Sequence, residues 1–215
     1  MVALISEETK LRDEIASVGK SLFDRGLTFG STGNISARLP GGELLMTPTN
    51  ESLGSLDPQK LSKFSAEGVH VSGDRPTKEA FLHQCMYCHQ KLSGAVVHLH
   101  STYAVAASIL DDVNTDDVLP PLTAYYVMRV GTLPLIPYFP PGDDLLATAV
   151  GERARHSHAV LLANHGQVVA GRTLKDAQYA AEELEETAKL FLLLHGRATR
   201  PLTSDQSRRL WAENI

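Results

Sequence analysis

The stretch Ala95-Val-Val-His98-Leu-His100-Ser-Thr-Tyr103 combines an apolar run with two histidines near the middle of the chain. As a β-strand, it points successive side chains to opposite faces. His98 and His100 then share one face, while Val97 and Leu99 point to a packed layer on the other. A buried imidazole needs a partner for each ring nitrogen, and a divalent metal is one such partner. On spacing alone two interpretations stay open: part of a metal site, or a core histidine beside a hydrogen-bonded one.

The composition limits the class of protein. A length of 215 residues suits one α/β domain over 1–215, and 20 basic against 25 acidic residues give a net charge of -5. No long basic run stands out, which argues against nucleic acid as the main partner. No apolar run reaches membrane length, and the N-terminus lacks the apolar region of a signal peptide. We therefore expect a cytoplasmic protein without a membrane partner.

Local patterns predict an alternation of helices and strands. The expected helices cover residues 6–26, 80–92, 101–110, 143–156 and 173–195. The expected strands cover residues 43–47, 94–100, 133–142 and 159–165, with a pair of strands inside 63–71. Ser6 and Thr77 are the expected caps of the first two helices. The last helix carries glutamates that are expected to form a solvated side, namely Glu182, Glu183, Glu185 and Glu186.

The segment Cys85-Met-Tyr-Cys88-His has the letters of a haem attachment site or of a redox pair. Both interpretations are set aside, because the segment lies in the middle of an expected helix and no export signal precedes it. At helical spacing Cys85, Cys88 and Leu92 share one apolar face. We therefore expect the cysteines to pack as small hydrophobic residues.

A metal site needs a third ligand, and His165 is the best candidate because it ends a second buried strand. Three histidines leave an open coordination position, as in a catalytic zinc-type site. Glu79 stands at an expected helix start, where it is either a carboxylate favoured by the helix dipole or part of a site for an anion and a metal. Lys78 would add positive charge there. The other six histidines, His83 among them, are expected to be ordinary core or surface residues.

The chain resembles the class II aldolase/adducin family in the order of five motifs, which are Gly33-Asn34, Thr49-Asn50, Thr77-Lys78-Glu79, His98-Leu-His100 and Asn164-His165-Gly166. The resemblance implies a three-layer α/β/α sandwich with a mixed, mostly antiparallel central sheet. It implies a homotetramer with active sites between subunits. It also implies a divalent metal, with Zn2+ as the main expectation, bound by His98, His100 and His165. Glu79 would be an added ligand or an acid/base.

The same resemblance implies a binding site for a substrate phosphate. Its residues are Gly33, Asn34, Thr49, Asn50, Thr77 and Lys78. Aldolases of this family usually carry Gly at the position of Asn50 and a Ser pair at Thr77-Lys78, so the pocket is expected to differ in detail. They also use a tyrosine donated by the neighbouring subunit. That role maps to Tyr125, with Tyr126 as the alternative.

Within the family the chain is most similar to the 3-oxo-tetronate 4-phosphate decarboxylases, for example in Pro76-Thr-Lys-Glu79 and in Glu182-Glu-Leu-Glu-Glu-Thr-Ala-Lys189. This similarity implies a carbon–carbon lyase that releases CO2 through a metal-stabilised enediolate and forms dihydroxyacetone phosphate. Tyr125 or Glu79 would protonate C2.

Two other functions stay open. Aldol cleavage passes through the same enediolate, so an aldolase or epimerase acting on L-fuculose or L-ribulose phosphate is the alternative. A non-catalytic, adducin-like binding module is the third interpretation, and it predicts that the metal ligands are lost. His98, His100 and His165 are all present. Histidine ligands suit zinc, iron, cobalt and nickel alike, so the sequence leaves the identity of the metal open.

Overall fold

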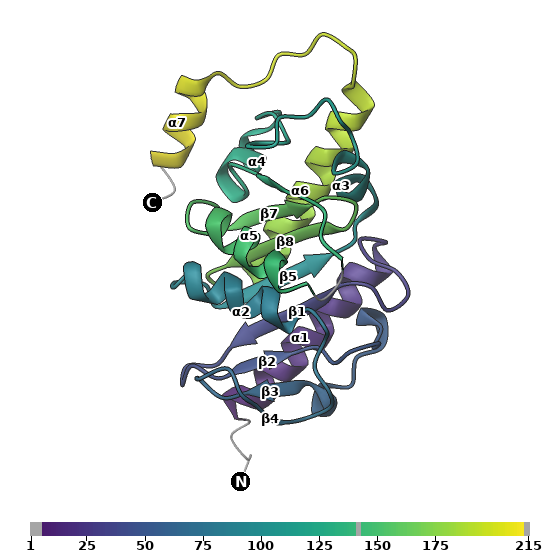
Figure 1. Ribbon diagram of the computed structural model, residues 1–215, viewed down its shortest axis with the longest axis vertical. Helices are drawn as coiled ribbons and strands as arrows, with labels where there is room; N and C mark the ends of the chain where they lie inside the picture. The colour runs from purple at the N-terminus through teal and green to yellow at the C-terminus, as the bar shows by residue number, and fades with distance from the viewer. Residues whose placement is uncertain (1–5, 141–142, 213–215) are drawn as a thin grey trace.

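The computed structural model describes residues 6–140 and 143–212, which form helices around an eight-stranded sheet (Figure 1). The strands are β1 (Asn34–Arg38), β2 (Leu44–Met46), β3 (Ser62–Phe64), β4 (His70–Ser72), β5 (Ala95–Leu99), β6 (Leu135–Ile136), β7 (Ala159–Leu162) and β8 (Gly166–Gly171). The α-helices are α1 (Glu7–Asp24), α2 (Ala80–His89), α3 (Thr102–Ala107), α4 (Ala124–Arg129), α5 (Asp144–Ala154), α6 (Leu174–Leu194) and α7 (Ser204–Ala212). Two short 3-10 turns, η1 (Leu53–Ser55) and η2 (Pro58–Lys60), link β2 to β3.

The sheet places β5 at its centre. The strand order is β4-β3-β2-β1-β5-β8-β7-β6. Every neighbouring pair is antiparallel except β6 with β7, which is parallel. The expected mixed, mostly antiparallel sheet is therefore confirmed. The expected strand at 133–142 is reduced to the two residues of the edge strand β6, and Pro141 and Gly142 lie outside the described residues.

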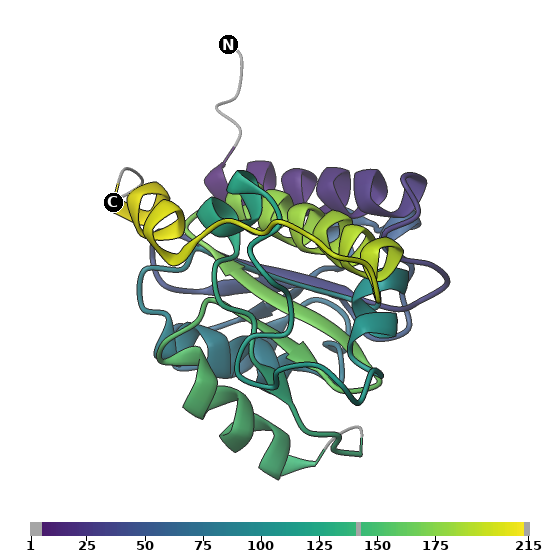
Figure 2. The same cartoon turned by 90° about the horizontal axis from the view of Figure 1, so that it is seen from above.

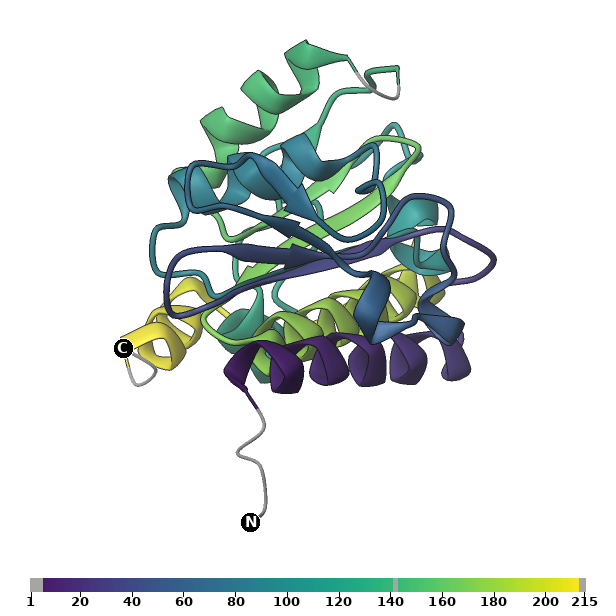
Figure 3. The ribbon, with the colours of Figure 1, turned by 90° about the horizontal axis from the view of Figure 1, so that it is seen from below.

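Helices cover both faces of the sheet and complete the three-layer α/β/α sandwich. The view from above shows α1 and α6 side by side on one face, with α2 and α5 on the other (Figure 2). The opposite view shows the same two layers (Figure 3). Successive side chains of β5 point to opposite faces of the sheet and contribute to both hydrophobic cores. Val97 and Leu99 pack under α1 and α6, while Val96 packs under α2 and α5. The histidine face of β5 is therefore the α2 and α5 face.

The two long helices follow from local sequence. Ser6 caps α1 by accepting a hydrogen bond from the backbone N–H of Thr9, as expected. Thr173 and Asp176 close a reciprocal capping box at the start of α6. The buried stripe of α6 includes Ala177 and Leu184, both fully buried against the sheet. Helix α7 lies in the polar tail, where the sequence pattern had not indicated a helix.

The glutamates of α6 are not a simple solvated side. Glu182 forms a two-pronged ion pair with Arg25 at the end of α1, at 2.6 and 3.0 Å. Glu183 accepts a hydrogen bond from Thr123, the cap of α4. Glu185 accepts the backbone N–H groups of Tyr103 and Ala104 in the first turn of α3. These carboxylates join α6 to three neighbouring helices, and Glu186 alone of the four is exposed.

The prediction for the cysteine face of α2 is confirmed only for Cys85, which packs against the core on this side of the sheet. The helix ends at His89, so Leu92 lies beyond it and is 78% exposed. Cys85 is half-buried and Cys88 is exposed, and both are free thiols. The packed face of α2 instead carries Leu82, His83, Met86 and Tyr87. Among the described residues, no helix has the length and apolar character that crossing a membrane requires.

Two consecutive leucines of α5 test the packing of the outer layer. Leu146 is buried against the sheet and Leu145 is 63% exposed. We expect Leu146→Ala to lower the free energy of unfolding by about 2–5 kcal/mol, because it removes buried methyl groups and leaves a cavity. Leu145→Ala should change it by less than about 0.5 kcal/mol. Denaturant unfolding of the two variants gives the comparison, and equal losses would contradict this placement of α5.

Candidate metal centre

The central strand β5 positions the first two histidines. His98 lies in the strand, opposite Asn34 of β1 and Val168 of β8, and is fully buried. Its Nδ1 lies 2.8 Å from the carbonyl oxygen of Gln167. A carbonyl oxygen only accepts, so Nδ1 carries a proton and Nε2 is the nitrogen that faces the other three side chains. His100 follows the end of β5, and its Nε2 lies 3.0 Å from Nε2 of His98.

A hairpin turn presents the third histidine. The strand β7 ends at Leu162, so His165 lies in the turn before β8. The expectation that His165 ends a strand is therefore wrong. Asn164 has a φ of 57°, in the left-handed region that Asn tolerates better than most residues. Its backbone N–H donates to Ser108 Oγ at 3.0 Å, which ties the turn to the end of α3. Only glycine fits at position 166, because a Cβ there would lie 2.2 Å from the carbonyl oxygen of Leu99. The absence of a side chain lets the turn approach the end of β5.

Glu79 brings a carboxylate to the three rings from the start of α2. Its Oε1 lies 2.9 Å from His165 Nε2, and its Oε2 lies 3.3 Å from His98 Nε2. It is the N-cap residue of α2 by position, but its side chain makes no capping hydrogen bond. Thr77, the expected cap, instead accepts the backbone N–H of Glu79 at its Oγ1. The carboxylate is thereby left to face the histidines.

The four side chains form one compact cluster. One ligand atom from each of Glu79, His98, His100 and His165 lies within 4.8 Å of all the others. The ring of His165 stands at 89° to both other rings, with centroids 5.0 Å from His98 and 4.5 Å from His100. Three imidazole nitrogens and one carboxylate oxygen converging on a point match the donor set of a catalytic zinc-type site. The cluster can hold a divalent metal ion.

The electrostatics of the cluster favour a cation. Burial raises the pKa of Glu79, but His98, His165 and Asn34 outweigh burial and hold that pKa far below its usual range. Burial, together with the neighbouring His98 and His165, lowers the pKa of His100 to about 3, although Glu79 opposes the shift. Burial also opposes the charged form of His98, yet the Glu79 carboxylate raises its pKa overall. An anionic carboxylate therefore attracts positive charge to His98 Nε2, at the place where a metal would compete with a proton.

The segments expected to bind phosphate lie next to this cluster. The loop after β2 runs beside the segment before α2, because Thr49 donates its backbone N–H to Arg75 and Thr77 donates its own to Thr47. Thr77 is buried, Thr49 is half-buried, and Asn50 and Lys78 are exposed.

Asn34 points inward and is 4% exposed. Its Nδ2 donates to Glu79 Oε2 at 2.7 Å and to Thr77 Oγ1 at 3.2 Å. Its side chain is therefore already occupied by protein partners.

The backbone explains one departure from the family pattern, at Asn50, and the glycine at position 33. Asn50 has a φ of 61°, in the left-handed region, and Asn is the non-glycine residue best suited to replace Gly there. Gly33 has a φ of 78°, and a Cβ on it would lie 2.9 Å from the carbonyl oxygen of His98. Gly33 is thus required by its close approach to β5, independently of any ligand.

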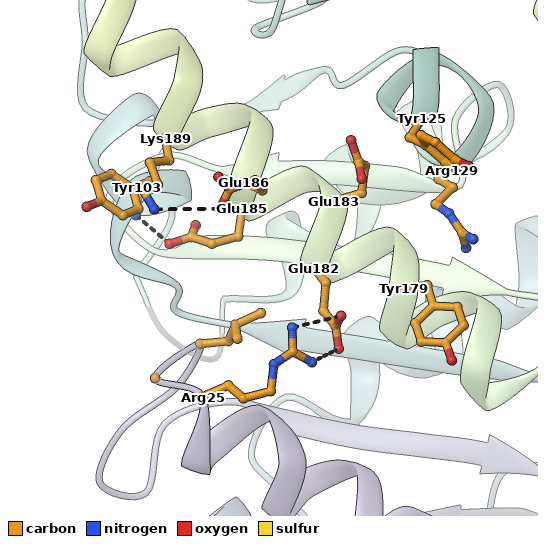
Figure 4. Close-up of a pocket in the computed structure, with 12 residues that line it drawn as sticks. Arg25, Tyr103, Tyr125, Arg129, Tyr179, Glu182, Glu183, Glu185, Glu186 and Lys189 are labelled. Carbon is orange, nitrogen blue, oxygen red and sulfur yellow. Dashed lines mark hydrogen bonds and ion pairs between the residues drawn. The ribbon is translucent and has the colours of Figure 1, made fainter. Parts of the chain in front are cut away.

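The two tyrosines of α4 have opposite environments. Tyr126 is 1% exposed and packs in the core under α6, whereas Tyr125 is 60% exposed. Tyr125 lines a hollow of about 620 Å³ between α1, α3, α4 and α6. Figure 4 shows Arg129 between Tyr125 and Tyr179, and Arg25 paired with Glu182. None of the four candidate ligands lines this hollow, so Tyr125 is not part of the metal cluster of its own chain.

Sequence reasoning missed His83, a fully buried residue that contacts Asn34. A signal was available, because His83 follows Glu79 by four positions in a helical segment and therefore lies on the same side. Ser36 likewise follows Asn34 by two positions on β1 and shares its face. Neither signal identifies a partner on its own, since the contact between α2 and β1 depends on the tertiary fold.

The family of the chain follows from comparison with known proteins. The profile of the class II aldolase and adducin N-terminal domain matches residues 13–192. The chain belongs to this family. The matched residues include helices of both layers, the whole sheet and all four residues of the metal cluster.

Three known proteins place the chain within the family. A 3-oxo-tetronate 4-phosphate decarboxylase of Escherichia coli K12 is 47% identical over 203 residues, which cover 94% of this chain and 96% of the relative. The crystal structure of YgbL from Escherichia coli has a TM-score of 0.92 and 46% identity, covering 95% of this chain and 99% of that chain. An L-fuculose phosphate aldolase of Methanococcus maripaludis is 34% identical over 182 residues, covering 85% of this chain and 96% of the relative.

Removal of one imidazole tests the ligand set. We expect His100→Ala to lower the affinity for a divalent metal by more than about 100-fold, beyond the loss that residues supporting a ligand usually cause. His156→Ala is the matched control, since His156 is exposed near the end of α5. Metal content after dialysis, measured with circular dichroism to verify folding, compares the two. Equal metal content in both variants would remove His100 from the ligand set.

Proposed function

We propose that this protein is a metal-dependent decarboxylase that converts a 3-oxo-tetronate 4-phosphate to dihydroxyacetone phosphate and CO2. The observation that carries the proposal is the cluster of Glu79, His98, His100 and His165 in a chain 47% identical to a decarboxylase of that name. A non-catalytic module would have no need to keep four converging ligands. The reaction makes the protein a carbon–carbon lyase.

In this reaction the metal cluster would stabilise charge, and the phosphate-binding residues would orient the substrate. A divalent cation, when bound, supplies Lewis-acid stabilisation of the negative charge that collects on the substrate oxygens as CO2 leaves. Glu79 holds its carboxylate ionised at the cluster through Asn34 and the imidazoles. The phosphate is held by Gly33, Thr49, Asn50, Thr77 and Lys78, with Asn34 supporting them. Anchoring the phosphate fixes the distance from C4 to the reacting carbons and supplies the orientation.

Decarboxylation also needs one proton. The bond between C1 and C2 breaks, its electron pair moves to C2 and the C3 oxygen, and C2 must then be protonated. Glu79 is ionised in this environment, so the proton comes from another acid. Tyr125 is assigned that role, since Tyr126 is buried in the core and its hydroxyl has no hydrogen-bond partner among the described residues. Because Tyr125 lies outside the cluster of its own chain, it acts from a second copy.

A tyrosine that acts between copies requires an oligomer. We infer a homotetramer with active sites between subunits, and the exposed hollow that contains Tyr125 and Arg129 supports it (Figure 4). The metal is assigned as Zn2+, which the three-histidine and carboxylate donor set suits. The free thiols of Cys85 and Cys88 suit a reducing, cytoplasmic location. We also propose that the chain is one domain over 1–215.

The alternative function is aldol cleavage or epimerisation of a ketose phosphate such as L-fuculose or L-ribulose phosphate. It has a specific support in the 34% identity to an L-fuculose phosphate aldolase. Both reactions place negative charge on the same two oxygens, so the cluster serves either. The higher identity to the decarboxylase favours loss of CO2.

The substrate test follows directly from this choice. Purified protein loaded with zinc should release CO2 from 3-oxo-tetronate 4-phosphate and form dihydroxyacetone phosphate in equal amounts. Treatment with a chelator should abolish the release, and added zinc should restore it, because the cluster without a cation cannot neutralise the developing charge. A coupled assay for the product measures both. Retro-aldol cleavage of L-fuculose phosphate without any CO2 release would establish the alternative instead.

The adjacent tyrosines provide a matched pair. We expect Tyr125→Phe to lower kcat about 10²- to 10⁴-fold, the range that loss of a positioned acid typically costs. Tyr126→Phe should leave kcat close to the wild-type value, because the Tyr126 hydroxyl is buried and has no partner within residues 6–140 and 143–212. Steady-state rates with the tetronate substrate give the ratio. The assignment is refuted if Tyr126→Phe carries the larger loss.

A further inference from the structure

A line of buried polar groups leads away from Glu79 through side chains of β1 and α2. Asn34 Nδ2 donates to Glu79 Oε2, and Asn34 Oδ1 contacts His83 Nε2. His83 Nδ1 lies 2.7 Å from Ser36 Oγ, and Ser36 Oγ lies 3.0 Å from the hydroxyl of Tyr87. His83 and Ser36 are fully buried, and Asn34 and Tyr87 are each 4% exposed. The mechanism above uses Glu79 and Asn34 but none of the other three.

The chemistry of each group fixes the direction of every bond in this line. An ionised carboxylate only accepts, so Asn34 must turn its NH2 group toward Glu79 and its carbonyl oxygen toward His83. That oxygen also only accepts, so His83 Nε2 carries a proton. Neutral His83 then accepts at Nδ1, where Ser36 must donate, and Ser36 in turn accepts from Tyr87. All donors therefore point toward Glu79.

The surroundings favour the neutral form of His83 that this direction requires. Burial and the nearby His98 together lower the pKa of His83 to about 3, although Glu79 opposes the shift. Burial also raises the pKa of Tyr87, so its hydroxyl keeps the proton that it donates. The guanidinium of Arg38 covers the outer end, 4.6 Å above the ring of Tyr87. Every group in the line is satisfied in one arrangement.

We propose that His83 is a positioning residue for the metal centre, and that its Nε2–H locks the amide of Asn34 with the NH2 group facing Glu79. The proposal rests on the proposed role of Glu79 at the metal. Without His83, only Glu79 and Thr77 hold the Asn34 amide, and an amide that turned over would place a carbonyl oxygen against a carboxylate oxygen. Glu79 would then lose a charge-assisted hydrogen bond and face a repulsion, and the carboxylate would leave the orientation that faces His98 and His165.

The line orients groups and does not conduct protons. A side-chain amide cannot pass a proton from its oxygen to its nitrogen without forming a high-energy imidic acid. Asn34 therefore blocks any relay between Tyr87 and Glu79. The function left to Ser36 and Tyr87 is to hold His83 in one tautomer and one ring orientation, as outer partners do for metal-binding residues.

Two substitutions at His83 separate positioning from packing. His83→Leu fills the space but removes both ring nitrogens, whereas His83→Gln offers an N–H for Asn34 and a carbonyl oxygen for Ser36. We expect His83→Leu to weaken zinc binding by about 10- to 100-fold and His83→Gln to restore most of it. Competition with a chromophoric chelator measures the affinity. In the decarboxylase assay, His83→Leu should lower kcat more than it raises KM, because the phosphate loops stay in place.

A half-buried histidine provides the control for lost stability. His158 donates from Nε2 to the carbonyl oxygen of Arg129 and lies just before β7, at the end of that strand away from His165. His158→Leu removes a part-buried hydrogen bond, so it should lower the thermal unfolding temperature without changing zinc affinity. If it weakens zinc binding as much as His83→Leu does, the loss reflects stability and the proposal is wrong. Unchanged zinc affinity in His83→Leu also overturns it.

The tautomer of His83 gives a test in the wild-type protein, where His83→Gln serves only to assign the ring signals. In protein labelled with 15N-histidine, the ring signals that His83→Gln removes should report a neutral, Nε2-protonated ring at pH 7. An Nδ1-protonated ring or an imidazolium would overturn the proposal. These measurements use zinc and the free protein. A protein that binds zinc yet releases no CO2 would refute the decarboxylase function and still decide the role of His83.

Discussion

The negative charge of Glu79 is the constraint on which the centre of this structure depends. A carboxylate withdrawn from water is costly unless it is paired and hydrogen-bonded. Here the partners are the ring nitrogens of His98 and His165, within 3.3 Å, and the amide of Asn34. Each partner comes from a different element. The sheet, the start of α2 and the β7–β8 turn must therefore all be correctly placed for the negative charge of Glu79 to be balanced.

The sequence could predict what is encoded locally. The two-residue period of a strand placed His98 and His100 on one face, and the 3.6-residue period located α1 and α6 close to their observed limits. The buried strand before His165 and the helix start at Glu79 made these two residues candidates, and the family motifs supported both. The sequence could not show that Glu182, Glu183 and Glu185 bind α1, α4 and α3, because a charged stripe looks the same whether its partners are water or other helices.

Two errors share a physical cause, which is that helix and strand ends are decided by tertiary contacts. The end of α2 at His89 moved Leu92 off the helix, and the end of β7 at Leu162 moved His165 into a turn. His83 was overlooked for a related reason. Its partners Asn34 and Ser36 lie on β1, more than forty positions earlier in the chain, and only the packing of α2 over the sheet makes them neighbours.

The β7–β8 turn also bears on the order of folding. The hydrogen bond from His98 to Gln167 joins positions 69 residues apart, and such distant pairings close slowly because the intervening chain must first be ordered. The last histidine therefore reaches the centre only when β8 has docked on β5. A cation that needs all three rings binds the completed sheet and not its fragments, so its binding energy is added to the native state alone. In the cell, metal supply would then set how much of this protein survives as well as how much is active.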